Sequence, residues 1–287
     1  MRAIIFVNPN KKDSRDLVGE VIKEMNSLNI EADTFSFAGK PYFCAEKNYD
    51  VAISLGGDGT VLSAARAMAP KKIPIFPINF GTFGFIAGIH PHEWRGVFGQ
   101  WLNGNAPVSR RLMFDVAVER EGSELCMGYC LNDVVISASG KIINLRVSYN
   151  ENNQKKILKL GQYRSDGLIV STPTGSTAYS AAAGGPIVDP ELEAVILNSI
   201  CPFTLTHRPM LMPAGEIIVD VDEKKRKSLL LTMDGQVTVK LKSGDKIFIK
   251  KAANSCLLIA SGRREFLQAL RTKLVWAGGG EGESQLD

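Results

Sequence analysis

Short apolar runs alternate with stretches of helical spacing in the first third of the chain. Residues Ala3 to Val7 form an apolar run typical of a buried strand, and apolar residues then recur at helical spacing from Leu17 to Leu28. Two further apolar runs, Val51 to Leu55 and Ile73 to Ile78, flank the amphipathic stretch Thr60 to Met68. Strands that alternate with helices predict a doubly wound, mostly parallel sheet, which binds ligands beyond the carboxyl ends of its strands.

The pattern changes to period two beyond the polar stretch Asn103 to Ser109, which predicts a β-rich second domain. The candidate strands are Met113 to Val118, Leu145 to Tyr149, Ile217 to Val221, Leu229 to Met233, Val237 to Leu241, Ile247 to Ile249 and Leu257 to Ala260. Helical spacing returns from Arg264 to Leu274, and Gly278 to Asp287 is small and polar, typical of a frayed tail. We therefore predict an α/β domain over residues 1–105, a β-rich domain over 106–262, and a C-terminal segment, 263–287, whose helix packs back on the first domain.

Composition narrows the class of protein. The 287 residues carry a formal charge of +4, which suits small anionic ligands but is too small for a nucleic-acid footprint. The basic run Lys224 to Lys227 is interpreted as a solvated hairpin tip. No segment is long and apolar enough for a signal peptide or a membrane span, and the five scattered cysteines are interpreted as buried, reduced thiols. We expect a cytoplasmic protein that binds neither nucleic acid nor membranes.

A glycine-aspartate loop, Gly56 to Thr60 (GGDGT), follows the predicted strand Val51 to Leu55 and opens a helix. Backbone amides at such a strand-to-helix turn commonly receive phosphate. A carboxylate in that loop would repel an anion unless it bound a metal or took a proton from an attacking hydroxyl, so Asp58 is a catalytic or metal-linked candidate. The string alone also fits a plain Asp-Gly turn, and both interpretations stay open at this point.

A second glycine cluster, Asn79 to Phe85 (NFGTFGF), follows the next predicted strand and should lie at the same edge of the sheet. Its Phe85 can stack on a base or fill the core, and composition alone favours the core. Neither cluster is a Rossmann G-x-G-x-x-G or a Walker loop, because no Gly-Lys-Ser/Thr ending is present. Ordinary dehydrogenases and P-loop enzymes are therefore disfavoured.

A hydroxyl-rich loop lies between Ser165 and Pro186 (SDGLIVSTPTGSTAYSAAAGGP). Helix caps explain one or two of its hydroxyls, but the others, together with the small residues Ala181 to Gly185, suit ribose and phosphate oxygens. The pair Asn132-Asp133 could bind a vicinal diol or form a routine turn. The three histidines are unclustered, and no histidine-based metal site is predicted.

Taken together and in order, these strings resemble the NAD kinase family, specifically ATP-NAD kinases of the bacterial type. The resemblance is carried by GGDGT, by NFGTFGF and by the long motif from Ser165 to Val188, and it runs from the first strand to the final helix. Met233-Asp234-Gly235-Gln236 and His207-Arg208-Pro209 also resemble family elements. The family commonly has Asn-Glu where this chain has Asn132-Asp133, so its carboxylate arm is one methylene shorter.

The resemblance implies a role for individual residues. It makes Asp58 the group that takes the proton from the adenosine 2′-hydroxyl of NAD, and it turns Phe85 from a core residue into a wall of the NAD site. It makes residues 106–262 the NAD-binding domain and residues 1–105 the nucleotide-binding domain. The implied binding residues are Gly57, Asp58, Gly59, Phe85, Asn132, Asp133, Arg164, Asp166, Thr177, Ala178, Tyr179, Ser180, Ala181, Ala182 and Gln236.

The implied activity is that of a phosphotransferase with an alcohol group as acceptor. ATP, or polyphosphate in its place, would donate its terminal phosphate to NAD and give NADP, with Mg²⁺ or another divalent cation held by the ATP near Asp58 and not by the protein alone. The resemblance also implies a homo-oligomer, a dimer or tetramer. Two alternatives stay open: a lipid or sugar kinase that shares the GGDGT loop, and a non-catalytic module that senses NAD or NADP.

Overall fold

The structure is a computed structural model of the chain. It describes residues 1–8, 12–36, 47–79, 84–86, 88–138, 140, 142–151, 157–204, 206–222 and 229–273, with the side chains of residues 12–16 and 126 left out. Cys44, residues 80–83 of the second glycine cluster, the basic run 224–227, Leu274 and the predicted tail 278–287 lie outside these ranges.

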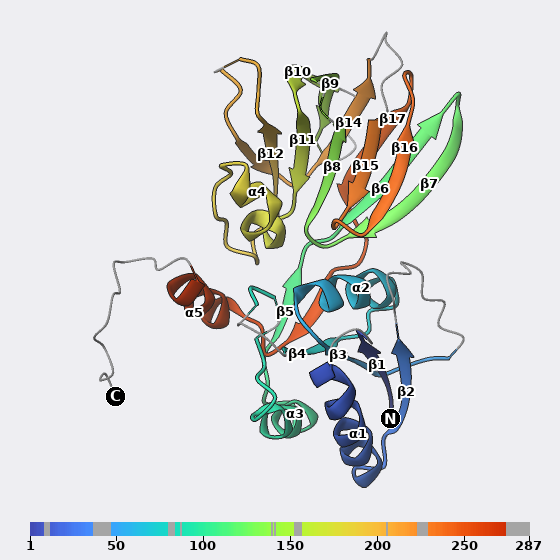
Figure 1. Cartoon of the computed structure of the whole chain (residues 1–287), viewed down its shortest axis with the longest axis vertical. Helices are drawn as coiled ribbons and strands as arrows, with labels where there is room; N and C mark the ends of the chain where they lie inside the picture. The colour runs from blue at the N-terminus through green and yellow to red at the C-terminus, as the bar shows by residue number, and fades with distance from the viewer. Residues whose placement is uncertain are drawn as a thin grey trace.

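The first domain is built on a six-stranded sheet (Figure 1). In sheet order its strands are β2 (Glu31–Ser36), β1 (Arg2–Val7), β3 (Val51–Leu55), β4 (Ile75–Ile78), β18 (Cys256–Ile259) and β5 (Val108–Arg111). All neighbouring pairs are parallel except β18 and β5, which are antiparallel. The predicted mostly parallel sheet is confirmed.

Helices cover both faces of this sheet, as the alternating pattern predicts. One face packs against α1 (Lys12–Ser27) and α3 (Trp94–Leu102), which contribute Val21 and Phe98 to a shared apolar cluster. The opposite face packs against α2 (Asp58–Met68) through residues such as Val61. Every residue of β3 is buried, which is expected of a strand that is covered on both faces. Figure 1 shows α2 on the side of the sheet that faces the second domain.

The second domain is a sandwich of two antiparallel six-stranded sheets, which confirms the β-rich prediction. One sheet has the order β10 (Leu158–Ser165), β9 (Ile143–Asn150), β14 (Glu216–Val221), β17 (Lys246–Lys251), β6 (Phe114–Arg120), β7 (Ser123–Cys130). The other has the order β13 (Met210–Pro213), β12 (Ala194–Ile200), β11 (Gly167–Ser171), β8 (Asp133–Ala138), β15 (Leu229–Met233), β16 (Val237–Leu241). Alternate residues of both sheets, such as Val147 and Leu231, form the core between them.

The change from one domain to the other does not follow the predicted boundaries. Strands β5 and β18 both lie within residues 106–262, which we assigned to the second domain, yet both belong to the first sheet. In particular, β18 (Cys256–Ile259) overlaps the predicted strand Leu257 to Ala260, and it belongs to the first sheet because it pairs with β4 and β5. We propose that the first domain comprises residues 1–112 and 253–273, so that the sandwich is an insertion within it.

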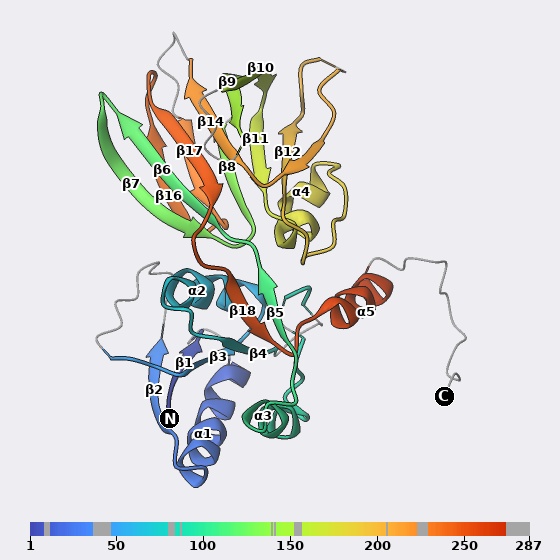
Figure 2. The ribbon, with the colours of Figure 1, turned by 180° about the vertical axis from the view of Figure 1, so that it is seen from behind.

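The C-terminal helix α5 (Arg263–Lys273) contacts both domains. Its Arg263 forms an ion pair with Asp189 of the segment that precedes β12, and the Lys273 ammonium lies 4.8 Å from the centre of the Phe85 ring. Figure 2 shows α5 beside the point where β5 and β18 run between the domains. Among the described residues, none of the helices combines the length and the apolar content that a bilayer crossing requires.

Two of the described cysteines match the prediction of buried thiols and one does not. Cys130 and Cys256 are buried, and burial raises the pKa of both thiols. Cys201 is exposed, because it follows the end of β12 in a turn at positive φ, and here the prediction is wrong.

Candidate active site

Asp58 lies at the start of α2, directly after the carboxyl end of β3. Gly57 is the N-cap residue, and the Asp58 carboxylate accepts hydrogen bonds from the backbone N–H groups of Phe85 (3.1 Å) and Ile86 (3.3 Å). The two glycine-containing loops therefore meet at this carboxylate, as their positions after neighbouring strands predict.

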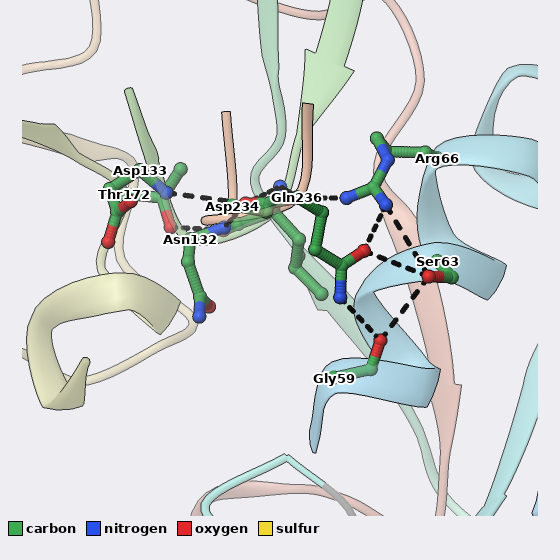
Figure 3. Close-up of polar contacts among 9 residues, drawn as sticks. Gly59, Ser63, Arg66, Asn132, Asp133, Thr172, Asp234 and Gln236 are labelled. Atoms are coloured by element: carbon green, nitrogen blue, oxygen red, sulfur yellow. Dashed lines mark hydrogen bonds and ion pairs between the residues drawn. The ribbon is translucent and has the colours of Figure 1, made fainter. Parts of the chain in front are cut away.

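A polar network joins the first turns of α2 to the β15–β16 turn of the second domain (Figure 3). The Gln236 side chain donates to the Gly59 carbonyl oxygen (2.8 Å) and accepts from the Ser63 hydroxyl (2.8 Å). The Arg66 guanidinium also donates to Gln236, and it forms an ion pair with Asp234 (2.9 Å). The predicted residues Gly59 and Gln236 are thus in direct contact across the domain boundary.

The same β15–β16 turn fixes the Asn132-Asp133 pair. The Asp234 carboxylate accepts hydrogen bonds from the backbone N–H groups of Leu131 (3.1 Å), Asn132 (2.7 Å) and Asp133 (3.4 Å). Burial, and then the negative charge of Asp234, raise the pKa of Asp133 from 3.8 to about 7. Burial also raises the pKa of Asp234, and Arg66 and the backbone N–H groups of Asn132 and Leu131 oppose this effect.

The hydroxyl-rich loop packs against Asn132 from the other side. It folds into the 3-10 turn η2 (Thr174–Thr177) and the short helix α4 (Tyr179–Ala182). A Cβ atom at Gly175 would lie 2.1 Å from the Asn132 carbonyl oxygen, so only glycine allows this approach. The Thr172 hydroxyl donates to the Leu131 carbonyl oxygen (2.5 Å), which fixes the loop to the same turn. The loop that carries the predicted residues Thr177 to Ala182 is therefore fixed at its start, through Thr172 and Gly175, to the turn that carries Asn132.

Several polar atoms around this turn are buried without a hydrogen-bond partner among the described residues. They are Asn132 Oδ1, Thr174 Oγ1 and Ser180 Oγ. In Figure 3 the Asn132 side chain extends away from the Asp234 network, into the space between the 174–182 turns and the start of α2. Tyr179 is 47% exposed on the adjoining helix. Unpaired buried polar atoms are costly, and a polar ligand bound at this loop could supply the missing hydrogen bonds.

Two predicted residues lie apart from this group. Arg164 and Asp166 stand at the β10–β11 connection, whereas Asp133 pairs with Ser171 at the other end of β11. With about 3.3 Å of rise per strand residue, that separation is on the order of 15 Å. The Arg164 guanidinium lies 4.0 Å from the centre of the Phe203 ring, and both Arg164 and Asp166 are exposed. The structure therefore does not bring them to Asp133 within one chain.

Within the described ranges there is no group of three or more histidine, cysteine, aspartate or glutamate side chains that could hold an ion. Asp58 is the acidic residue of the first turn of α2. One carboxylate together with substrate phosphates suits Mg²⁺, which keeps several waters and seldom uses an all-protein cage.

Comparison with known proteins agrees with this geometry. Residues 40–106 match the ATP-NAD kinase N-terminal domain, and residues 131–261 match the ATP-NAD kinase C-terminal domain. The NAD kinase of Treponema denticola is 39% identical over 281 residues, which cover 96% of this chain and 97% of that protein. The chain belongs to the NAD kinase family. The NAD kinase of Geobacter sulfurreducens is 42% identical over 229 residues, covering 79% of this chain and 78% of that protein.

Solved NAD kinase structures share the fold. The crystal structure of yeast NADH kinase complexed with NADH superposes with a TM-score of 0.84 at 22% identity, covering 99% of this chain and 90% of that one. An NAD kinase from Archaeoglobus fulgidus in complex with ATP gives a TM-score of 0.72 at 25% identity, covering 95% and 99%. The two-domain fold and the family predicted from the motifs are both confirmed.

Sequence reasoning missed three residues of the interdomain network: Ser63, Arg66 and Asp234. Asp234 belongs to the family-like string Met233 to Gln236 but was assigned no role of its own, and its positive φ of 51° is typical of a turn. Ser63 and Arg66 lie three residues apart on a predicted helix, a spacing that places them on one face. That spacing was the available signal, but nothing in the sequence showed that this face meets the second domain.

Proposed function

We propose that this chain transfers the terminal phosphate of ATP to the adenosine 2′-hydroxyl of NAD, which gives ADP and NADP. The observation that carries this proposal is the hydrogen-bonded network that joins Gly59, the residue after Asp58 at the N-terminus of α2, through Gln236, Arg66 and Asp234 to the backbone of Asn132 and Asp133. In this proposal the helix terminus receives phosphate and the Asn132-Asp133 pair receives the ribose diol, and the network links the two, as phosphoryl transfer to a sugar hydroxyl requires. Family membership supports the same reaction.

In this mechanism Asp58 orients the acceptor hydroxyl and takes its proton. The hydroxyl oxygen forms a bond to the terminal phosphorus, and the bond from that phosphorus to the bridging oxygen of the leaving ADP breaks. Two backbone N–H groups, those of Phe85 and Ile86, hold the Asp58 carboxylate in place. The remaining amides at the start of α2 face the anionic donor, because the N-terminus of a helix carries a partial positive charge.

The adenosine ribose would be held by the second domain. The Asn132 side chain and the Asp133 carboxylate offer a donor and acceptors to its two hydroxyls. Thr177, Tyr179 and Ser180 would line the remainder of the site with hydroxyls and one exposed aromatic ring. The shorter arm of Asp133, compared with the family's usual glutamate, places the carboxylate nearer the backbone that Asp234 fixes.

A divalent cation such as Mg²⁺ would be held by the ATP phosphates, and the Asp58 carboxylate could contribute an oxygen ligand. When bound, the ion neutralises phosphate charge.

Arg164 and Asp166 support an oligomeric enzyme. Both are exposed and far from Asp133 within one chain, so they would complete the NAD site of a neighbouring subunit. We propose a homo-oligomer, a dimer or tetramer, in a cytoplasmic location. Light scattering of the wild type and of Asp166→Ala, combined with their KM for NAD, would test the shared site. A fully active monomer would contradict it.

The decisive experiment is incubation of the purified protein with NAD, ATP and Mg²⁺. The product should be detected by its reduction with a dehydrogenase that accepts only NADP. A phosphorus NMR spectrum of the product should place the new phosphate at the 2′ position. Parallel reactions with diacylglycerol and fructose 6-phosphate test the lipid and sugar kinase alternatives. Binding of NAD without any phosphorylated product would favour the sensing module and contradict the proposal.

A further inference from the structure

The Arg66–Asp234 ion pair connects the two domains at the candidate active site. The Arg66 side chain is 8% exposed and the Asp234 side chain is 0% exposed, with 2.9 Å between Nη1 and Oδ2. Arg66 belongs to α2 of the first domain, and Asp234 belongs to the β15–β16 turn of the second. A buried ion pair is often no more stabilising than apolar residues of the same volume, so stability alone is a weak reason for this one.

Asp234 has little capacity left for a ligand. Its Oδ1 accepts from the N–H groups of Asn132 and Leu131, and more distantly from that of Asp133. Its Oδ2 accepts from Leu131 N–H and from Arg66. The carboxylate is therefore committed to the backbone that carries the Asn132 and Asp133 side chains, and it fixes where those side chains begin.

Arg66 fixes the same turn to the helix that begins at Asp58. Its guanidinium donates to Gln236, and Gln236 in turn donates to the Gly59 carbonyl oxygen at 2.8 Å. Gly59 is the residue next to Asp58, and Arg66 lies two turns further along the same helix, so α2 is held to the second domain at two points. The network in Figure 3 thus runs without a break from the acceptor-binding pair to the residue beside the proposed base.

We propose that Arg66 and Asp234 are positioning residues, which set the distance between Asp58 and the ribose held by Asn132 and Asp133. This inference rests on the proposed NAD kinase activity and assigns residues that the motifs did not. A shift of about 1 Å between reacting groups can cost on the order of 100-fold in rate, so a rigid link between the two domains has a direct catalytic value.

The test compares three variants: Arg66→Lys, Asp234→Asn and the control Arg120→Lys. Arg66→Lys keeps the charge but loses the planar fork that reaches Asp234 and Gln236 together. Asp234→Asn keeps the size but replaces one acceptor oxygen by a donor. Arg120 forms a comparable pair with Asp245, whose side chain is also 0% exposed, at 2.7 Å within one sheet of the sandwich. The control thus removes the same kind of contact far from α2.

We expect both positioning variants to lose about 10- to 100-fold in kcat/KM for NAD, while KM for ATP stays within about 2-fold of wild type. Arg120→Lys should change the unfolding midpoint without this loss. A second readout is the pH profile of kcat/KM for NAD, which should shift to lower pH in Asp234→Asn. The groups that face Asp133 are Asp234, the Cys130 thiol and, through Asp234, Arg66, so removal of the Asp234 charge makes Asp133 easier to ionise.

Undiminished kcat/KM in folded Arg66→Lys and Asp234→Asn, or a loss equal to that in Arg120→Lys, would overturn the inference. Failure of both variants to fold at any assay temperature would assign the pair to folding and would overturn it as well. These outcomes require an active wild type. If the wild type itself gives no phosphorylated NAD, the proposed function fails first.

Discussion

When the Asp133 carboxyl group is ionised, its buried charge lowers the free energy of unfolding, and a single substitution can measure by how much. Asp133 is only 4% exposed, and burial together with the charge of Asp234 raises its pKa from 3.8 to about 7. A carboxyl group whose pKa is higher in the folded state favours folding in its protonated form. Below about pH 4 Asp133 is protonated in both the folded and the unfolded state, and its contribution to the free energy of unfolding is fully present. This contribution is lost progressively as the pH rises from about 4 to about 7.

The size of this effect follows from the two pKa values. The difference between 3.8 and about 7, at about 1.4 kcal/mol for each pH unit, gives about 4 kcal/mol. Asp133→Asn removes the charge and keeps the size. At pH 8 we expect the free energy of unfolding of the ligand-free variant to exceed that of wild type by up to about 4 kcal/mol, and below pH 4 the two should be alike.

The assay is urea unfolding of the ligand-free protein between pH 4 and pH 8, with Asp220→Asn as the control. Asp220 lies on β14 in the other sheet of the sandwich. The stability difference between Asp133→Asn and wild type should grow with pH, and the KM for NAD should rise about 10-fold because one ribose acceptor is lost. A variant that is less stable than wild type at pH 8, or a difference that does not change with pH, would refute the reasoning.

Three other predictions concern the reaction and the loop beside it. Asp58→Asn should lower kcat by roughly 100- to 10,000-fold and leave NAD binding by calorimetry intact, and wild-type turnover would remove Asp58 from the role of base. Gly175→Ala should lower the free energy of unfolding by about 1–3 kcal/mol, because its Cβ would lie 2.1 Å from the Asn132 carbonyl oxygen. The control Gly96→Ala meets no atom within 4 Å and should not destabilise, and equal effects would contradict the close approach. Removal of divalent cations with EDTA should abolish turnover but not NAD binding, and turnover that persists would exclude the metal requirement.

The sequence predicted the sheet and its ligand edge because fully buried strands leave an unmistakable apolar run. Val51–Leu55 is buried along its whole length, so its composition reports its position directly. An edge strand that is partly exposed lacks such an apolar run. β2 (Glu31–Ser36) was not predicted, because no residue in it is fully buried and its sequence, EADTFS, is mostly polar. The helix Trp94–Leu102 was also missed.

For the site, the sequence predicted candidate residues within each local motif, but it did not predict which residues pair across the two domains. Asp58 and the 177–182 loop are each encoded within a few consecutive residues, since a strand-to-helix turn is a local structure. The ion pair between Arg66 and Asp234 joins positions 168 residues apart, and only the packing of α2 against the sandwich brings them together. The sequence determined which residues can do chemistry. The tertiary structure decided which of them meet, because the burial and charge that govern such contacts depend on neighbours that are distant in the chain.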